Sequence, residues 1–270
     1  MSDYHLALSD AEILRYRMMA QRAIDEEHDL FARAGVVPGA VVVDVGCGPA
    51  AMSVELARLV GPAGRVIGIE RDPSALDAAR HLIAQSECDN VEVHPGEATA
   101  TGVGSRTADV VLMRHVLAHN GGREQQIVDH LADLARPGGT VYLLDVDLTA
   151  MRMLGADPDL DDVMACYAQF HLQTGNDPMV GLQLARLLAA AGLDLVDFVG
   201  RYSILEAPPG VRPPAWAARD RMLSAGVIDE DTLRRWTAGF ERFDTGATRP
   251  TLFVSQFVAI GRRPEHPSTG

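Results

Sequence analysis

The stretch VVVDVGCGPA, residues 41–50, decides the fold of this chain. Its four valines, interrupted only by Asp44, suit a strand that is buried on both faces. Gly46 and Gly48 then allow a sharp turn and a close approach of the backbone to a ligand, because neither carries a Cβ atom. Pro49 suits the first turn of a helix, since it has no amide hydrogen to lose. The stretch therefore predicts a strand, a glycine turn and a helix N-terminus, at the strand end where open parallel sheets bind nucleotide-like ligands.

Strands and helices alternate on both sides of this stretch. Helical patterns follow the first, second and fourth strands, at the spacing of right-handed βαβ units. We therefore expect an α/β fold: a doubly wound, Rossmann-like sheet of seven strands whose last strand is antiparallel. The expected strands are residues 41–45, 65–70, 91–94, 108–113, 140–145, 193–202 and 251–260.

The chain divides into four expected parts. Residues 1–38 form an N-terminal helical cap, with a helix from about residue 9 to residue 33. Residues 39–204 and 250–262 form the Rossmann-like domain. Residues 205–249, which lie between the last two strands, form a helical lid insertion, and residues 263–270 form a flexible tail.

Composition limits the possible partners. The 270 residues are 47% hydrophobic, which is enough to bury a core. Acidic residues outnumber basic ones by 37 to 24, and the net charge of −13 repels phosphate backbones and anionic membranes. We therefore expect neither nucleic acid nor membrane as a partner. The N-terminal residues show no secretory signal pattern, and no apolar run has the length of a membrane span, so we expect a cytoplasmic protein.

Two residue groups resemble metal or redox sites without matching one. The three cysteines, Cys47, Cys88 and Cys166, are far apart and have no CxxC spacing, so we interpret them as reduced thiols. An acidic cluster lies at residues 157–162. It has neither a glycine-containing loop nor a terminal Glu, and we interpret it as a solvated helix start. No metal is expected.

An acid on the next strand completes a nucleotide-binding pattern. Glu70 ends that strand, and an ionised carboxylate can accept hydrogen bonds from two ribose hydroxyls. A glycine turn with such an acid also describes nicotinamide-binding folds, so the pattern alone leaves both cofactors open. Asp44 favours a cationic ligand, because a carboxylate close to the turn repels a pyrophosphate.

DVGCG at residues 44–48, together with Glu70, resembles the nucleotide-binding pattern of class I S-adenosylmethionine-dependent methyltransferases. The resemblance covers about residues 10–147 and is strongest to the small-molecule branch that includes ubiquinone, menaquinone and natural-product enzymes. It implies S-adenosylmethionine as cofactor, a small organic acceptor such as a specialised metabolite, and S-adenosylhomocysteine as product. The chain departs from this family at Pro49-Ala50, where many members have Thr or Ser followed by Gly.

The resemblance also implies roles for single residues. Glu97 and Ala98, after the third strand, correspond to the adenine site, and Arg114, at the end of the fourth strand, corresponds to the residue whose carbonyl meets the methionine ammonium. Tyr16, on the helix ahead of the first strand, and Arg71, next to Glu70, are assigned to the same site. The complete predicted cofactor site is Tyr16, Asp44, Gly46, Cys47, Gly48, Glu70, Arg71, Glu97, Ala98 and Arg114.

The acceptor stays open among oxygen, nitrogen, carbon and sulfur. Transfer to a nucleophilic atom needs alignment alone, whereas a hydroxyl or an acidic carbon calls for a base such as histidine. His119, next to the expected methionine end, is the first candidate base and His115 the second. The predicted acceptor site is His115, His119, Tyr167, Phe170 and His171. Trp216 and Trp236 of the lid are either further wall residues or core residues, and an aromatic residue on a helix is more often part of a core.

Two other functions fit parts of the pattern. An NAD(P)-dependent oxidoreductase is the alternative within the enzymes. A catalytically silent homologue that binds the ligand for regulation, or that serves as a dimer scaffold, is the alternative outside them. Methionine-bearing helices also lead us to expect a homodimer.

Overall fold

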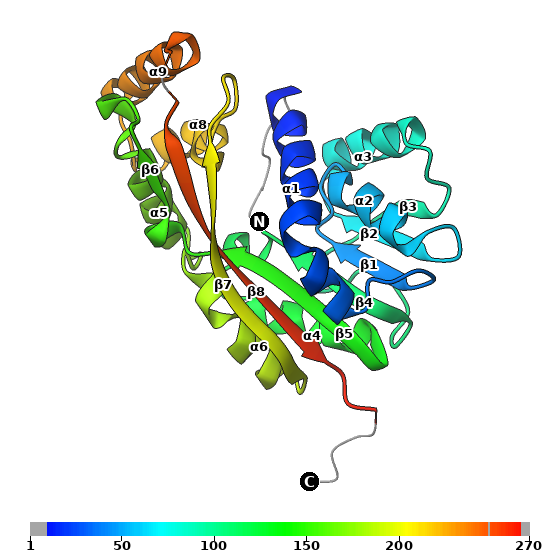
Figure 1. Cartoon of the computed structure of the whole chain (residues 1–270). Helices are drawn as coiled ribbons and strands as arrows, with labels where there is room; N and C mark the ends of the chain where they lie inside the picture. Colours follow the sequence, from blue (N-terminus) through cyan, green and yellow to red (C-terminus); the bar gives the residue numbers. More distant parts are fainter. Residues whose placement is uncertain (1–9, 248, 266–270) are drawn as a thin grey trace.

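The computed structural model describes residues 10–247 and 249–265. It contains one eight-stranded sheet with helices on both faces and a helical lid above one end (Figure 1). Five strands run parallel in the spatial order β3-β2-β1-β4-β5. Their bounds are β1 Val41–Val45, β2 Arg65–Glu70, β3 Val91–Pro95, β4 Ala108–Arg114 and β5 Ala135–Val146.

Three further strands extend the sheet beyond β5. The last strand, β8 (Thr251–Arg262), is antiparallel to β5 along one edge and to β7 (Asp194–Glu206) along the other. Where β8 runs past β5, its first residues pair with a short strand, β6 (Arg152–Leu154). The α/β fold with an antiparallel last strand is thus confirmed, but the predicted count of seven strands is wrong. β6 has three residues, too few to give a strand pattern, and it is ordered by its pairing with β8.

Alternate strand residues pack against helices on opposite faces. On one face, Val42 and Leu112 lie in the core cluster formed with α1 (Asp10–Ala34) and α2 (Ala51–Val60). On the other, Val43 lies in a cluster with α4 and α6. The bounds of the remaining helices around the sheet are α3 Pro73–Gln85, α4 Glu124–Leu134, η4 Val180–Gln183 and α6 Leu184–Ala190. Burial on both faces explains why the central strands are rich in β-branched residues.

Helix α1 is fixed to the sheet by a buried polar network. The carboxylate of Glu27, only 2% exposed, pairs with the guanidinium of Arg114 on β4 and accepts a hydrogen bond from the hydroxyl of Tyr142 on β5. The ring of Phe31 packs on that of Tyr142, with centroids 5.2 Å apart. We call Glu27, Arg114 and Tyr142 the cap anchor.

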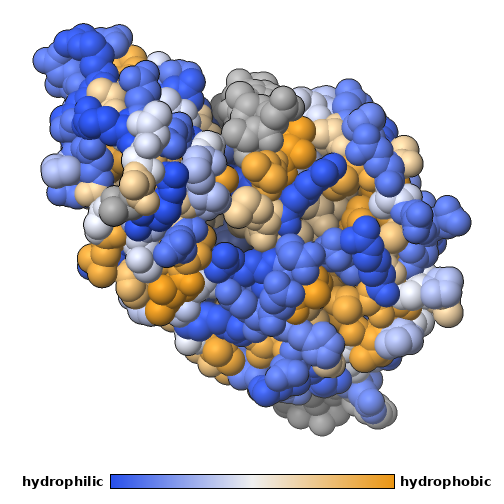
Figure 2. Space-filling view, turned by 45° about the horizontal axis from the view of Figure 1, so that its top comes forward, coloured by the Kyte–Doolittle hydropathy of each residue, from blue (hydrophilic) through white to orange (hydrophobic). Residues whose placement is uncertain are grey.

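The lid is built from two segments of the chain. Its core contains Trp236, which is fully buried, together with Leu160, Val163 and Phe240. The elements are η2 Leu148–Ala150, η3 Pro158–Leu160, α5 Val163–Gln173, α7 Pro214–Ala217, α8 Arg219–Ser224 and α9 Glu230–Thr245. The insertion at 205–249 therefore packs with residues 148–173, which the sequence analysis assigns to the Rossmann-like domain. Figure 2 shows the outer surface of the lid, at upper left, as largely hydrophilic.

Several lid residues have structural roles that the sequence did not indicate. The indole N–H of Trp236 donates to Asp162 at 2.8 Å, and the ring of Trp216 packs edge-on against Phe240. Both tryptophans are therefore part of the lid core, the second of the two roles expected for them, and neither lines the cavity. Asp157 and Asp159 pair with Arg242. Among the described residues, no cluster of His, Cys, Asp or Glu is arranged to hold a metal ion.

Some predictions lie outside these observations. Residues 266–270 of the predicted tail and residues 1–9 of the predicted cap are outside the described residues. Within the described part, no helix combines the length and apolar character needed to cross a membrane. The domain boundaries, the cytoplasmic location and the homodimer stay predictions.

Candidate functional site

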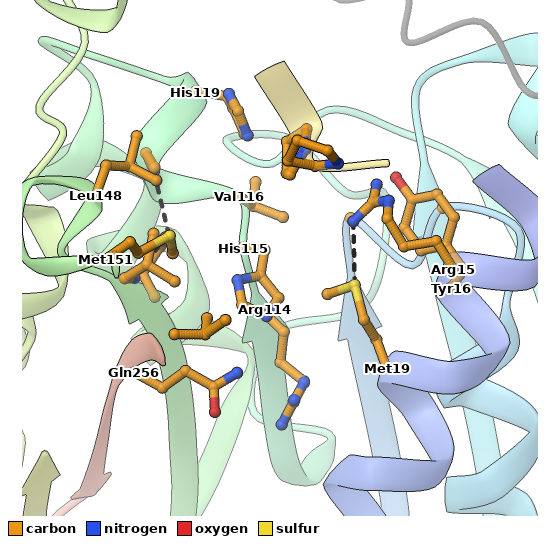
Figure 3. A pocket seen from close by; sticks show the side chains of 18 of the residues that line it. Arg15, Tyr16, Met19, Arg114, His115, Val116, His119, Leu148, Met151 and Gln256 are labelled. Atoms are coloured by element: carbon orange, nitrogen blue, oxygen red, sulfur yellow. Dashed lines mark hydrogen bonds between the residues drawn. The ribbon is translucent and has the colours of Figure 1, made fainter. Parts of the chain in front are cut away.

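A cavity of about 380 Å³ lies at the carboxyl ends of β1, β4 and β5. Figure 3 shows Arg15, Tyr16 and Met19 projecting from α1 on one side, with Leu148 and Met151 on the opposite side. The glycine turn lies at one end of this cavity, and lid residues lie at the other. The parallel strand ends and the lid thus enclose one continuous space.

The glycine turn needs its two glycines for different contacts. Gly46 has φ +77°, and a Cβ atom at this position would overlap the side chain of Val116. Gly48 has φ +54°, and the ring of Tyr16 lies 3.6 Å from the place where its Cβ atom would be. Tyr16 therefore covers the turn from α1. Ala50 has a φ of +60°, which is a left-handed backbone conformation. Many members of the family that this chain resembles have glycine at this position, and glycine adopts this conformation more readily than alanine does.

The carboxylate of Glu70 joins the glycine turn to the end of β2. It accepts hydrogen bonds from the backbone N–H groups of Gly48 at 3.0 Å, Arg71 at 2.8 Å and Asp72 at 2.9 Å. A carboxylate offers about four lone-pair sites, so capacity remains for a ligand hydroxyl. Glu70 is both a support of the turn and a possible ribose acceptor.

Asp44 places a buried acid under the same end of the cavity. Its side chain is 3% exposed and accepts a hydrogen bond from the hydroxyl of Ser53 at 2.6 Å. Burial raises the pKa of Asp44 to about 6, an effect that the guanidinium of Arg114 only partly offsets. A cationic ligand would stabilise the ionised form, whereas an anionic ligand would be repelled.

Three other predicted cofactor residues line the cavity on the β2 and β3 side. They are Arg71, Glu97 and Ala98. Arg71 and Glu97 approach each other to 3.8 Å, and about half of the Glu97 side chain is exposed. Cys47 is buried at the turn and lines the cavity as well. All ten predicted cofactor residues therefore surround one end of a single cavity.

His115 has a strained backbone and an unsatisfied ring nitrogen. Its φ is +56°, which is uncommon for a residue with a side chain and is typical of functional sites. Its Nε2 atom is buried without a hydrogen-bond partner among the described residues. Burial, followed by the nearby Arg114 and Arg15, lowers the pKa of His115 to about 3. The orphaned nitrogen suits a hydrogen bond from a ligand.

Three rings meet where η1 (Leu117–His119) lies against α5. The ring of His171 lies 4.9 Å from that of His119 and 4.6 Å from that of Tyr167, measured between centroids. Nδ1 of His171 lies 2.9 Å from the carbonyl oxygen of Ala118. Burial lowers the pKa of His171 to about 4 and that of His119 well below its usual value. These rings are neutral at pH 7.

Phe170 packs beside these rings but does not line the cavity. Its side chain packs in the lid core, beneath the guanidinium of Arg221, and it is absent from the cavity lining formed by the described residues. The ring of Phe170 meets that of His171 edge-on, with centroids 6.4 Å apart, so Phe170 packs against His171 from within the lid core. Its predicted place in the acceptor site is therefore wrong.

The sequence analysis missed the methionines of the cavity. Half of the ten methionines line it, and they come from α1, α2, β6, α5 and the segment after η2. Methionine is flexible and fits apolar surfaces of irregular shape. Because they are spread along the chain, no local pattern joins them. They are Met19, Met52, Met151, Met153 and Met164.

Known proteins resemble this chain in the region that carries the glycine turn. A family model described as a methyltransferase domain matches residues 37–183. The arsenite methyltransferase of Halobacterium salinarum is 32% identical over 137 residues, which cover 51% of this chain and 35% of that protein. A demethylmenaquinone methyltransferase of Halalkalibacterium halodurans is 30% identical over 117 residues, covering 43% of this chain and 47% of that protein. The chain thus spans half or less of the length of these two relatives.

Solved structures share the fold. A SAM-dependent methyltransferase from Aquifex aeolicus superposes with a TM-score of 0.53 at 17% identity, covering 71% of this chain and 92% of that one. At this identity, the likeness concerns the arrangement of strands and helices.

Proposed function

This chain belongs to the methyltransferase-domain family, and from that premise we propose that it transfers a methyl group from S-adenosylmethionine to a small organic acceptor, releasing S-adenosylhomocysteine. One observation carries the proposal. The glycine turn, Asp44 and Glu70 lie at one end of a cavity whose other end is apolar and covered by a lid. Such a cavity can hold cofactor and acceptor side by side. A specialised metabolite is our finer expectation for the acceptor.

The residues at the cofactor end fit S-adenosylmethionine. When bound, this cofactor supplies an electrophilic methyl group on a sulfonium. Asp44 is the buried carboxylate that would face its cationic methionine part, and Glu70 would accept from its ribose. Glu97 and Ala98 would meet the adenine, and Tyr16 would cover the site from α1. The buried acid and the orphaned nitrogen of His115 both gain a partner from such a ligand.

The same observations argue against two alternatives. A nicotinamide dinucleotide would bring its pyrophosphate close to the buried Asp44, which makes the oxidoreductase less suitable. The Halobacterium relative is named for arsenite. The arsenic atom of arsenite is soft and favours thiolate ligands. Here Cys47 lies at the glycine turn, Cys166 on α5 and Cys88 before β3, so no thiol cluster faces the cavity. We therefore favour an organic acceptor.

Calorimetric titration tests the cofactor. We expect saturable, micromolar binding of S-adenosylhomocysteine and no heat from NAD or NADP. Glu70→Ala should weaken binding by about 100-fold or more, because it removes hydrogen bonds to a charged group. Glu92→Ala, which alters an exposed carboxylate on the neighbouring strand β3, is the control and should bind normally.

Two further measurements keep this test decisive. Glu70 also accepts from three backbone amides, so thermal melting of Glu70→Ala must show that it is folded. Asp44→Asn, which keeps the side-chain volume, is the second variant if it is not. Lack of S-adenosylhomocysteine binding by the unmodified chain would reject the methyltransferase, and binding of NAD instead would favour the oxidoreductase.

A further inference from the structure

The acceptor end of the cavity is apolar. Beneath the lid it is lined by Leu160 and Phe240 from the lid core and by Leu148, Met151 and Met164 around them. Such a wall binds hydrocarbon or ring surfaces through burial, without a fixed hydrogen-bond pattern. The bulk of the acceptor should therefore be apolar.

The arginines around the cavity are already bonded. Arg15 pairs with Glu12, Arg22 with Glu26, Arg71 with Glu97, Arg114 with Glu27 and Arg212 with Asp244. Arg152 donates to the backbone carbonyls of Thr149 and Met151, each at 2.7 Å. A phosphate or carboxylate on the acceptor would have to break one of these interactions. The charge pattern therefore favours an uncharged acceptor.

His171, which lines this space, has one nitrogen with a defined hydrogen-bonding role. A carbonyl oxygen only accepts hydrogen bonds, so the contact with Ala118 requires that Nδ1 of His171 carry the hydrogen. In the neutral ring, Nε2 is then a lone-pair acceptor. His171 is buried and lines the cavity next to Tyr167 and His119. The backbone thus fixes both the tautomer and the orientation of this imidazole.

We propose that the acceptor is an uncharged, largely apolar molecule with a hydroxyl group, and that Nε2 of His171 accepts the proton of that hydroxyl. This inference rests on the proposed methyl transfer. The acceptor oxygen forms a bond to the methyl carbon, the sulfonium keeps the electron pair of the broken carbon–sulfur bond, and the hydroxyl proton goes to Nε2. The reaction is then balanced in atoms and in charge.

The basicity of His171 limits which kind of hydroxyl group we expect on the acceptor. Its pKa of about 4 keeps Nε2 free of a proton at neutral pH, so the acceptor always meets a lone pair. The same value makes it a weak base, which suits an acidic hydroxyl better than an alkyl alcohol. After burial, the hydrogen bond to the carbonyl of Ala118 raises the pKa of His171 in part, and the guanidinium of Arg221 lowers it. We therefore expect a phenol or an enol.

A matched pair of probes separates this role from simple packing. 1-Naphthol and 1-methoxynaphthalene have the same ring system, but only the first has a proton to donate. Their binding is measured in the presence of saturating S-adenosylhomocysteine. His171→Asn is the test variant, because its side-chain N–H can still donate toward Ala118 while the second nitrogen is lost. His130→Gln, a change of a distant histidine on α4, is the control.

We expect the unmodified chain and His130→Gln to bind 1-naphthol about 5- to 10-fold more tightly than the ether, the value of one hydrogen bond. His171→Asn should bind both probes equally and bind S-adenosylhomocysteine normally. Nitrogen-15 NMR should show His171 with its hydrogen on Nδ1. The inference is overturned if the unmodified chain binds both probes equally or neither, or if His171→Asn keeps the preference. Failure to bind S-adenosylhomocysteine would instead reject the proposed function.

Discussion

Helix α1 and the lid both cover the cavity, but they are held in place by different interactions. The cap anchor ties α1 to β4 and β5 through a buried ion pair and a buried hydroxyl. The ion pairs of the lid, such as those of Arg242, are largely exposed and join lid residues to one another. The lid thus has its own core and meets the sheet through continuous strands. Helix α1, in contrast, shares a core cluster with the sheet and is also tied to it by a buried ion pair. Burial, more than the number of ion pairs, decides which cover is rigid.

Breaking the cap anchor should have the largest effect. Arg114→Met leaves the carboxylate of Glu27 buried without its cation, and we expect a loss of about 3 to 5 kcal/mol in the free energy of unfolding. Urea denaturation measures this loss. Arg33→Ala, which removes an exposed pair between the same helix and β7, should lose less than about 1 kcal/mol. Similar losses in both variants would contradict the comparison.

A change in the lid core should stay local. Trp236→Phe removes the hydrogen bond to Asp162 and leaves a small void, and we expect the lid to lose about 2 kcal/mol of local stability. Native-state hydrogen exchange should show faster exchange in α5 and α9 with unchanged protection in α2. Binding of S-adenosylhomocysteine should change less than about 2-fold. Loss of protection throughout the sheet would show that the lid is not a separate unit.

The affinity of the cofactor end for its ligand should depend on pH, because Asp44 lies there. Asp44, with a pKa of about 6, carries a proton in acid, and a cationic ligand must displace that proton to bind. Affinity for S-adenosylhomocysteine should therefore fall about 10-fold from about pH 7.5 to about pH 5. Titrations at several pH values measure this, and in Asp44→Asn the fall should be much smaller. A fall of equal size in the variant would assign the effect to another acid, such as Asp145, whose pKa burial raises to about 7.

The smallest effect is expected at the lid surface. Arg242→Ala removes exposed pairs with Asp157 and Asp159, which salt and water screen. We expect no measurable change in melting temperature or in S-adenosylhomocysteine binding. A clear loss of melting temperature would mean that these surface pairs hold the lid together.

The sequence predicted one end of the site much better than the other. Topology brings the ends of β1, β2 and β4 together, so Gly46, Glu70 and Arg114 could be placed in one site from strand order alone. At the acceptor end, Leu148, Met153 and Phe240 line one cavity only because the lid packs over the sheet. No local period relates them. Helix phase was the one unused signal, since it places Met164 on the same face of α5 as Tyr167 and His171.

The errors in the fold have the same origin. β6 exists because β8 continues past β5, and residues 148–173 join the lid because Trp236 reaches Asp162 from a distant segment. Both features depend on contacts between residues that are far apart in the sequence, and these contacts require that β8 already be in the sheet. The five parallel strands depend on neighbouring βαβ units, which local patterns predict well.

The position of β8 has a consequence for synthesis. It is the last strand in the chain order, yet it lies inside the sheet. One edge of β8 pairs with β7, and the other edge pairs with β6 and then with β5. Until residue 262 has left the ribosome, β5 and β7 each expose a row of unpaired backbone groups, which are templates for aggregation. The nascent polypeptide is therefore most in need of chaperone protection between the synthesis of β7 and that of β8.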